Sequence, residues 1–437
     1  MNVTEGNLFW NEQVGIIEKY PYLSRDKKCD VLIIGGGMAG LMCAYKLHNL
    51  GVDYILVEGD RIAKGITKNT TAKITSAHGI IYSNLVSAYG KEKAQMYLTA
   101  NENAVKEYEK ITGGIDCDFE KRSAYTYSVK DRRMIERETE TVNNLGVRAE
   151  FVRKTELPFE IMGAVKFANQ AQFNPLKFIS AIARDMNIYE NTFVEDIQGT
   201  TAITTKGKIK AEKIIVTTHF PFINRHGSYF LKLYQHRSYV SAFENIPLLK
   251  GMYVDSDKKG MSFRSYKNLL LVGGGGHRTG KKGEDWEVIN KRVKEWYPTA
   301  RIKYTWATQD CMSLDLMPYI GKYSKNMPGV YVATGFNKWG MTSSLIASEI
   351  LADLVRGKRS EYKDLFSPQR GILKPRLFVN GFEAAFNLVT PAKKRCPHMG
   401  CALKWNEVEH TWDCPCHGSR FEKDGRLIDN PAKKDLQ

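Results

Sequence analysis

The sequence predicts an α/β fold in three parts: a domain built on a parallel sheet, an α+β antiparallel-sheet domain interleaved with it, and a small all-β subdomain at the end. Three patterns support this prediction. The segment CDVLIIGGGMAG places a glycine-rich turn between an apolar strand and a helix, strands of alternating polarity fill the middle of the chain, and CPHMGCALKWNEVEHTWDCPCHGS (396–419) gathers cysteines and histidines.

Length and composition are those of an ordinary globular protein. The 437 residues, 43% hydrophobic and 26% charged, are enough for two or three domains. No apolar run approaches the length of a membrane span, and the first residues lack the basic and apolar segments of a signal peptide. We therefore expect a cytoplasmic protein and do not expect membrane contact.

The net charge of +16 raises the question of nucleic-acid binding. The basic residues are spread along the chain, however, and no base-stacking or phosphate-binding motif accompanies them, so we expect no nucleic-acid partner. One segment has a local excess, because 356–395 holds ten Lys or Arg and three Asp or Glu. Such a segment would attract an acidic redox protein or an anionic membrane surface.

The N-terminal part of the chain alternates strands and helices. Residues 1–29 form a leader, a strand starts at Asp30, a helix covers 41–50 and a second strand starts at Asp53, which together make a βαβ unit. A long helical stretch is predicted from about Ser83 to Lys110. The leader also carries a few aromatic anchors: Phe9, Trp10, Tyr20 and Tyr22.

The middle of the chain, roughly 115 to 300, mixes strands such as SAYTYSV with short helices such as PLKFISAIARDM, which predicts an α+β region. The chain then returns to an apolar strand, GVYVATGF, and a helix that Gly357 ends. A basic connector, 358–395, contains one amphipathic helix, which we expect to pack on its own protein. The apolar face of this helix would consist of Phe378, Phe382, Ala385 and Val389.

Gly35, Gly37 and Gly40 match G-x-G-x-x-G in the strand–turn–helix context of a dinucleotide site. The glycines allow the tight turn, the approach of a pyrophosphate and close helix–strand packing. Glu58, at the end of the second strand, would accept hydrogen bonds from an adenosine ribose. FAD and NAD fit this site equally, because both contain ADP. The phosphates would lie at the start of the helix, beside Met38 and Ala39.

The later segment GVYVATGFNKWGMTSS favours a flavin. It offers another strand, turn and helix start, which in flavoproteins brings the chain back to the isoalloxazine ring. Gly340 frees the backbone there, so that the N–H groups of Met341 and Thr342 would face the pyrimidine oxygen and stabilise negative charge on reduced flavin.

Residues 30–357 resemble the D-amino-acid oxidase and glycine oxidase superfamily of FAD-dependent oxidoreductases. The resemblance rests on the glycine motif with Glu58, on KGITKNTTAKITSAHG, on QFNPLKFISAIA, and on DLMPYIG ahead of YVATGFNKWGMT. It implies a Rossmann-like FAD-binding domain, an antiparallel-sheet domain that holds the substrate, and hydride transfer from a C–N bond to flavin. It also implies that Val194 contacts adenine through its backbone and that four residues lie near the flavin: Thr70, Thr71, Ala72 and Lys73.

His78 lies where some relatives in this superfamily attach their flavin covalently, but we expect a structural histidine here. No general base is assigned, because a substrate amine that arrives neutral needs none. The candidate substrate-site residues are Arg264, His277, Arg278, Lys338 and Trp339.

The C-terminal cluster has the spacing of a metal site. Four of the eight cysteines fall in the last tenth of the chain, which favours a local site over a disulfide framework. Cys396-x-His398 and Cys414-x-x-His417 offer two thiolates and two imidazoles, a set that zinc or a [2Fe–2S] cluster would accept. The two other cysteines of these loops, which could form a disulfide, are Cys401 and Cys416.

CPHMGC together with CPCHGS resembles the two boxes of Rieske domains of the cytochrome bc type. The resemblance implies a [2Fe–2S] cluster bound by the thiolates of Cys396 and Cys414 and by the imidazoles of His398 and His417. It also implies a disulfide that joins Cys401 to Cys416. His410 lies outside both boxes and is expected at the surface.

The sequence departs from the Rieske pattern in three places. Strands are not predicted ahead of the first box, so the subdomain (396–437) must borrow its base from the flavin domain. The proline loop has Asn430 where Gly is usual. Ser419 matches a hydroxyl that bonds a bridging sulfide, but Phe421 replaces a frequent tyrosine. The missing donor predicts a potential in the lower or middle part of the Rieske range, roughly −150 to +300 mV.

These patterns predict an FAD-dependent dehydrogenase of an amine or amino-acid-like substrate. Flavin takes two electrons as a hydride and a [2Fe–2S] cluster handles one at a time, so electrons would leave through the cluster to an external carrier, which could be acidic. Two alternatives stay open at this stage. The same chain could run in reverse as a reductase, or it could be a redox sensor without turnover.

Overall fold

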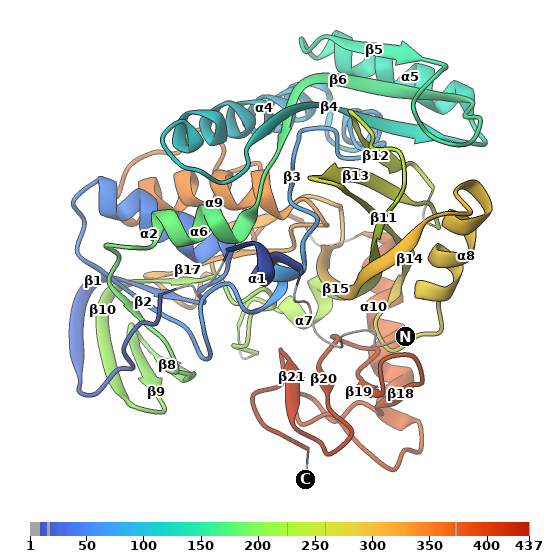
Figure 1. Ribbon diagram of the computed structural model, residues 1–437. Coiled ribbons are helices and arrows are strands. Elements are labelled where there is room, and N and C mark those ends of the chain that lie inside the picture. The colour runs from blue at the N-terminus through green and yellow to red at the C-terminus, as the bar shows by residue number, and fades with distance from the viewer. Residues whose placement is uncertain (1–8, 15–17, 225, 258, 372–373, 437) are drawn as a thin grey trace.

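The computed structural model describes residues 9–14, 18–224, 226–257, 259–371 and 374–436. Two large sheets lie side by side with helices against them, and a small antiparallel sheet lies at one end (Figure 1). This arrangement confirms the predicted fold class: a parallel nucleotide-binding sheet, an antiparallel substrate sheet and an all-β C-terminal subdomain. No helix among the described residues is both long and apolar enough to cross a membrane.

The first sheet has the order β16-β17-β10-β1-β2-β7, and its strands from β17 to β7 run parallel. The hairpin β8–β9 extends it from β10. Its central strands are buried on both faces, as parallel strands covered by helices must be. The bounds are β1 Lys27–Ile34, β2 Tyr54–Val57, β7 Ile188–Tyr189, β8 Val194–Gln198, β9 Thr201–Thr204, β10 Gly207–Val216, β16 Tyr319–Lys322 and β17 Val330–Thr334.

Two buried helices cover one face of this sheet: α2 (Met38–Asn49) and α9 (Gly340–Val355). A Cβ added to Gly40 would lie 1.9 Å from the Gly35 carbonyl oxygen, so only glycine lets α2 pack this closely on β1. Three shorter elements complete this domain: η1 (Ile66–Asn69), α6 (Pro175–Ile182) and α7 (Tyr229–Lys232).

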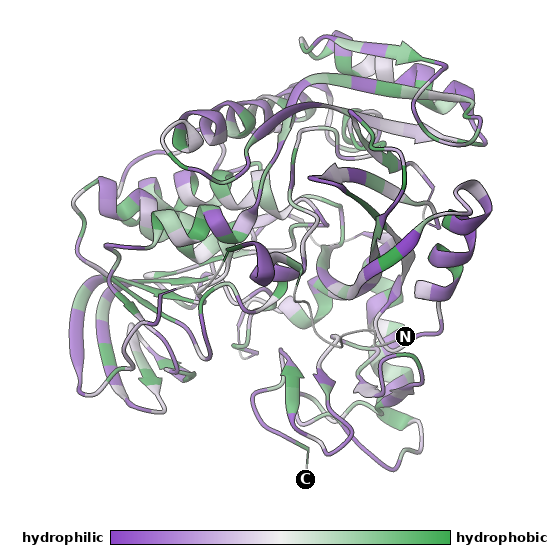
Figure 2. Cartoon of the chain, in the orientation of Figure 1, coloured by the Kyte–Doolittle hydropathy of each residue, from purple (hydrophilic) through white to green (hydrophobic). Residues whose placement is uncertain are grey.

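The helical stretch predicted from about Ser83 to Lys110 is present, with one break. The structure has two helices, α3 (Tyr82–Tyr89) and α4 (Lys91–Thr112), separated by Gly90. Gly90 has φ +84, in the left-handed region that ends helices. Hydrophobic and hydrophilic residues alternate along α4, which buries one face against the domain (Figure 2).

The second sheet has the order β15-β11-β14-β13-β12-β4-β6-β3, with β5 paired to β6. Helices α5 (Arg132–Asn144) and α8 (Trp286–Trp296) pack on it. Its two longest strands, β11 and the edge strand β15, pair along their whole length. The bounds are β3 Lys73–Ile74, β4 Glu120–Ser128, β5 Ala149–Val152, β6 Gly163–Gln172, β11 Leu233–Glu244, β12 Met252–Asp255, β13 Ser262–Tyr266, β14 Leu269–Arg278 and β15 Arg301–Ser313.

The leader is anchored between the two large sheets through α1 (Phe9–Val14). Phe9 and Trp10 are fully buried, and the Phe9 ring stacks on Trp306 with centroids 5.2 Å apart. Tyr20 donates from its hydroxyl to the Ala183 carbonyl at 2.7 Å. Tyr22, also expected as an anchor, is 58% exposed.

The C-terminal subdomain is a four-stranded antiparallel sheet, β18 (Lys404–Asn406), β19 (Thr411–Asp413), β20 (Arg420–Phe421) and β21 (Leu427–Asp429). This subdomain rests on the larger domain, as the sequence predicts for so short a segment. Glu409 lies buried between Arg237 of β11 and Arg420 of β20, with Arg237 Nε 2.9 Å from Glu409 Oε1 and Arg420 Nη2 2.8 Å from Glu409 Oε2. Tyr239 adds a hydroxyl bond to the same carboxylate.

A helix, α10 (Pro375–Val389), occupies the segment where the sequence predicts an amphipathic one. The expectation that its apolar face packs on its own protein is wrong. Phe378, Phe382 and Val389 are 71%, 69% and 79% exposed, whereas Asn380 and Asn387 are buried. The Asn380 side chain fixes this orientation, because it bonds Leu231 and Arg278 beneath the helix. The Asn387 side chain bonds Glu383 of the same helix, and only its backbone carbonyl reaches the C-terminal subdomain, where it accepts from the Ala402 N–H.

Replacing Glu409 by Gln should destabilise the attached subdomain by about 3–5 kcal/mol, because a neutral amide leaves the buried cation of Arg237 without the carboxylate it pairs with and removes one of the three carboxylates around Arg420. Burial alone would raise the pKa of Glu409, but these two guanidinium groups hold it to about 2, below the ordinary 4.5. The stability that the carboxylate contributes is therefore complete above pH 4.5 and is lost as the pH falls towards 2.

Urea unfolding at pH 7 and at a series of acidic pH values measures this difference. The matched control is Glu407→Gln, an exposed carboxylate two residues away, which should unfold like the unmodified protein. Equal unfolding midpoints for the two variants would contradict a role for Glu409 in attachment.

Candidate functional site

The predicted nucleotide residues lie along one edge of the parallel sheet. Four neighbouring strands, β2, β1, β10 and β17, run in the same direction, so their carboxyl ends meet at this edge. In that order they lead into Glu58, Gly35, Thr217 and Gly335. Ligands of open α/β sheets bind at such an edge.

The glycine turn is held open by polar contacts around it. Glu58 accepts from the backbone N–H of Gly36 at 2.7 Å, and Thr67 Oγ1 accepts from the N–H of Met38 at 3.0 Å. A Cβ added to Gly37 would meet no atom closer than 3.5 Å, so the turn is open on that side. The first turn of α2, which contains Met38 and Ala39, leaves backbone N–H groups without partners within the helix, and such a helix start favours a phosphate.

Residues 70–73 cross from the parallel sheet to the substrate sheet, where β3 begins. Trp10 Nε1 donates to the Thr70 carbonyl at 2.9 Å, and Ala72 is fully buried with φ +52. Lys73 Nζ donates to Thr71 Oγ1 at 3.2 Å. Burial, together with the nearby charge of Arg264, lowers the pKa of Lys73 to about 7. An anionic group bound beside residues 70–73 would stabilise the charged form of Lys73 and so raise its pKa again.

Arg264 was a candidate substrate residue, and the structure contradicts that prediction. Its guanidinium is fully buried and donates to the carbonyls of Thr71, Ala72 and Phe173. It therefore holds the 70–73 segment in place through its Nη atoms, whereas its buried Nε has no hydrogen-bond partner among the described residues.

Gly340, Met341 and Thr342 form the first turn of α9, as predicted, and this turn leaves backbone N–H groups without helical partners. Tyr108 donates to the Met341 carbonyl at 3.0 Å and fixes its position. Val194 begins β8, at the edge of the parallel sheet. Strand β17, which precedes α9, belongs to the same parallel sheet as β1, which precedes the glycine turn. The first turn of α9 and the glycine turn therefore follow strands of one sheet.

His78 has both ring nitrogens engaged inside the protein. Nε2 donates to the Thr75 carbonyl at 2.7 Å, Nδ1 accepts from the Tyr97 hydroxyl at 2.9 Å, and the ring stacks on Trp339. Burial lowers the pKa of His78 to about 3, so the ring is neutral. These contacts fit the expected structural role. They also assign Trp339, a candidate substrate residue, to packing.

A group of polar side chains lies on one face of the β11–β15 pair. Lys338 Nζ donates to Ser238 Oγ at 2.9 Å, and His236 lies opposite Asp310 in the strand register. Burial lowers the pKa of His236 to about 2 and raises the pKa of Asp310, whereas Lys338 is exposed. Lys338 is two residues ahead of α9, so this group faces the flavin-side turn.

Neighbouring residues of β11 face the other way. Gln235, Arg237 and Tyr239 all contact the C-terminal subdomain: Gln235 Nε2 donates to the Asn430 carbonyl at 3.2 Å, and the other two bind Glu409. The odd-numbered residues of β11 in this stretch therefore contact the C-terminal subdomain. Its even-numbered residues, among them His236 and Ser238, point to the other face of the sheet.

Arg278 was also a candidate substrate residue, and its contacts contradict that prediction. Its guanidinium donates to the carbonyls of Pro415 and Cys416 at 2.9 and 3.0 Å and to Asn380 Oδ1 of α10 at 2.8 Å. Arg278 thus clamps a metal-binding loop and α10 to the substrate sheet. His277 stacks with Tyr239 and bonds the Gly275 carbonyl.

The two predicted imidazole ligands converge. His398 Nδ1 and His417 Nδ1 lie 3.2 Å apart with their ring planes at 88°, as two ligands of one iron would. Burial lowers the pKa of His398 to about 3 and also lowers that of His417, so both rings are neutral, the form that binds metals.

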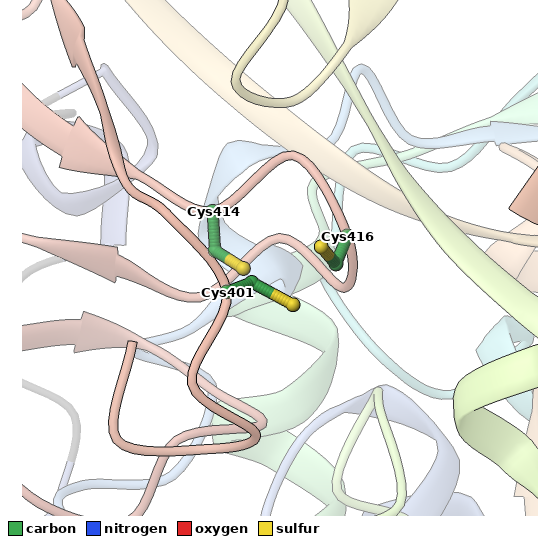
Figure 3. A group of neighbouring side chains, drawn as sticks. All are labelled: Cys401, Cys414 and Cys416. Atoms are coloured by element: carbon green, nitrogen blue, oxygen red, sulfur yellow. The ribbon is translucent and has the colours of Figure 1, made fainter. Parts of the chain in front are cut away.

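The four cysteines of the two loops also converge. The sulfur atoms of Cys401, Cys414 and Cys416 lie within 4.8 Å of one another (Figure 3), and Cys396 hydrogen-bonds Cys414. Hydrogen bonds from these three thiols hold the pKa of Cys414 well below its ordinary value. All four are unbridged thiols in this structure, with Cys401 beside Cys416. The residues present therefore fit a cluster with Cys and His ligands, and the disulfide stays a prediction.

Residues that match the Rieske pattern and residues that depart from it both lie around this centre. Ser419 is fully buried, hydrogen-bonds Cys396, and accepts from the Ala432 N–H at 2.9 Å. Phe421 is fully buried without a hydroxyl to offer. Asn430, before a cis peptide bond to Pro431, donates to the carbonyls of Thr218 and Phe220. His410 is exposed, as expected.

A loop that sequence reasoning missed, 217–224, joins the two sites. At its start, Thr217 Oγ1 donates to the Gly35 carbonyl at 3.0 Å. Further on, the Phe220 ring lies 6.4 and 6.0 Å from the rings of His398 and His417, and Asn224 Oδ1 accepts from His398 Nε2 at 2.8 Å. The sequence did hold a signal for this loop, the apolar strand KIIVTT (213–218). If this strand runs parallel to the one before Gly35, its end lies at the same edge of the sheet as Gly35.

Comparisons with known proteins agree with this geometry. Residues 30–354 match the family described as FAD dependent oxidoreductase, and residues 387–437 match the Rieske [2Fe-2S] domain. YhfW of Bacillus subtilis (strain 168), named as a Rieske 2Fe-2S iron-sulfur protein, is 32% identical, with 98% of this chain and 96% of YhfW covered.

Solved structures share the fold of the larger part. L-proline dehydrogenase from P. horikoshii superposes with a TM-score of 0.67 at 17% identity, covering 79% of this chain and 98% of that one. Glycine oxidase from Geobacillus kaustophilus gives 0.66 at 20% identity, covering 79% and 100%. With the nucleotide edge, the converging ligands and these matches together, the chain belongs to the FAD dependent oxidoreductase family and carries a C-terminal Rieske [2Fe-2S] domain.

Proposed function

We propose that this chain is a dehydrogenase of an amine or amino-acid-like substrate that passes electrons through its Rieske centre to an external one-electron carrier. One observation supports it most strongly: the 217–224 loop bonds the glycine turn at one end and contacts both cluster histidines at the other. When bound, FAD accepts a hydride and the [2Fe–2S] cluster carries single electrons, so the pair converts two-electron into one-electron chemistry.

We assign the FAD contacts to the residues at the sheet edge. The glycine turn and the start of α2 would hold the pyrophosphate, Glu58 the ribose and Val194 the adenine, through its backbone. The segment 70–73 and the first turn of α9 would flank the isoalloxazine, where the cation of Lys73 and the α9 amides favour negative charge. We assign the cluster to Cys396, Cys414 and the two converging imidazoles: His398 and His417.

The substrate would lie on the face of β11–β15 that carries Lys338, Ser238, His236 and Asp310. The groups on this face can donate to a carboxylate and accept from an amine, which suits an amino-acid-like molecule. The names of the two structural neighbours, L-proline dehydrogenase and glycine oxidase, point to the same class.

The first test is anaerobic rapid mixing of the protein with a panel of amines and amino acids. A substrate should bleach the flavin absorbance, after which the EPR signal of a reduced [2Fe–2S] cluster should appear. Cys414→Ala should retain FAD and its bleaching but lose both the cluster signal and reduction of an external one-electron acceptor.

Cys117→Ala, which removes a buried thiol far from the cluster in sequence, is the control and should behave like the unmodified protein. A flavin that bleaches while the iron stays oxidised would defeat the proposal.

The second test concerns Asn224, whose Oδ1 accepts from His398 Nε2. This bond increases the electron density on the imidazole and so stabilises the oxidised cluster. Asn224→Leu should therefore raise the reduction potential by roughly 40 mV, the equivalent of about 1 kcal/mol for one electron. Asn224→Asp, a stronger acceptor, should lower it.

Redox titration followed by EPR measures both changes. The opposite signs of the two variants separate an electronic effect from simple loosening of the loop, which would shift both potentials in the same direction. Unchanged potentials in both would remove Asn224 from the cluster's surroundings.

A further inference from the structure

The outward face of α10 is apolar along its whole length. Eight residues of this 15-residue helix are exposed, and each has an apolar side chain. They recur at the spacing of one helical face, which runs about 22 Å at 1.5 Å per residue. Figure 2 shows hydrophobic colour along α10 beside the C-terminal sheet. The eight residues, called the α10 stripe below, are Pro375, Phe378, Val379, Phe382, Ala385, Phe386, Leu388 and Val389.

The helix cannot turn this stripe inward without losing buried polar contacts. Asn380 Nδ2 donates to the Leu231 carbonyl at 3.0 Å, and its Oδ1 accepts from Arg278. The Asn387 carbonyl accepts from the Ala402 N–H at 2.8 Å. These contacts reach α7, the substrate sheet and a cluster loop. The exposure of the stripe is therefore fixed by the fold.

Positive charge flanks both ends of the stripe. Lys374 and Arg376 lie at the start of α10, and Lys393, Lys394 and Arg395 follow its end. The one acid between them, Glu383, points inward, has a side chain only 16% exposed and pairs with Lys281 at 2.8 Å. A partner must therefore offer an apolar layer between negative groups.

We propose that the α10 stripe docks on an anionic membrane surface, with its rings in the acyl boundary and its flanking cations among the headgroups. A helix with this pattern lies in the plane of the interface. A second copy of the chain fits poorly, because two stripes packed face to face would bring the flanking cations of both copies together. An acidic carrier protein would match the charge but not the row of rings along a single convex helix.

Docking in this way would place the metal-binding loops at the lipid surface. Cys416 Sγ lies 3.8 Å from the Glu383 carbonyl, and Leu388 of the stripe approaches Gly400 of the other loop. Both loops are therefore within one helix diameter of the bilayer. The proposal stands independently of the flavin chemistry, because it rests only on the surface of α10 and the charges around it.

The test is flotation of the intact protein with vesicles of phosphatidylcholine alone and of phosphatidylcholine mixed with phosphatidylglycerol. We expect binding to the mixed vesicles, weak binding to the neutral ones, and release by high salt. The double variant Phe378→Ser/Phe382→Ser should reduce the bound-to-free ratio by at least about tenfold. Leu248→Ser, a 46% exposed apolar residue in the segment between β11 and β12, is its control and should bind normally.

Charge is tested separately. Lys393→Glu/Lys394→Glu should abolish the preference for anionic vesicles, whereas Arg153→Glu/Lys154→Glu, another adjacent exposed pair, should not. Flavin absorbance and the cluster EPR signal report that each variant is folded, and all should be unchanged. Failure of the unmodified protein to float with mixed vesicles overturns the proposal. So does a dimer in sedimentation velocity that Phe378→Ser/Phe382→Ser dissociates, because the stripe would then bind a second copy.

Discussion

The buried carboxylate of Glu409 is the constraint on which the arrangement of this molecule depends. It meets guanidinium groups from both sides of a domain boundary, Arg237 from the substrate sheet and Arg420 from the C-terminal sheet. The small sheet has only short strands and a small core of its own, so its position is set by contacts with its neighbour. A buried ion pair of this kind tolerates little misalignment, because each unpaired charge would remain away from water.

Attachment at this point lets one loop serve two sites. Residues 217–224 follow the strand β10, so their start belongs to the nucleotide edge, and their end lies against the imidazoles of His398 and His417. Strand β11 has a similar double role, since its alternating side chains face the subdomain or the polar group around Lys338. The 217–224 loop and strand β11 thus contact both the flavin domain and the C-terminal subdomain.

Local chemistry could be predicted from the sequence, and long-range pairing could not. The glycine turn and the Cys/His boxes are recognisable because a pyrophosphate or a metal demands fixed residue types at fixed spacing. Gly90 could have been noticed as a helix break. The bond from Asn224 to His398, by contrast, joins residues 174 positions apart, and the amphipathic pattern of α10 is the same whichever way it faces. Arg264 and Arg278 resembled substrate ligands because an arginine in a strand gives no hint of its partner.

The contacts of the C-terminal subdomain are distributed around it: Glu409 on one side, Asn430 on another, His398 on a third and the Arg278 clamp at the loop tip. No single hinge would release such a set, since rotation about any one contact strains the rest. Displacing the iron–sulfur centre is therefore nearly the same event as unfolding its surroundings. We therefore expect the distance between the flavin site and the cluster site to be set by the native fold.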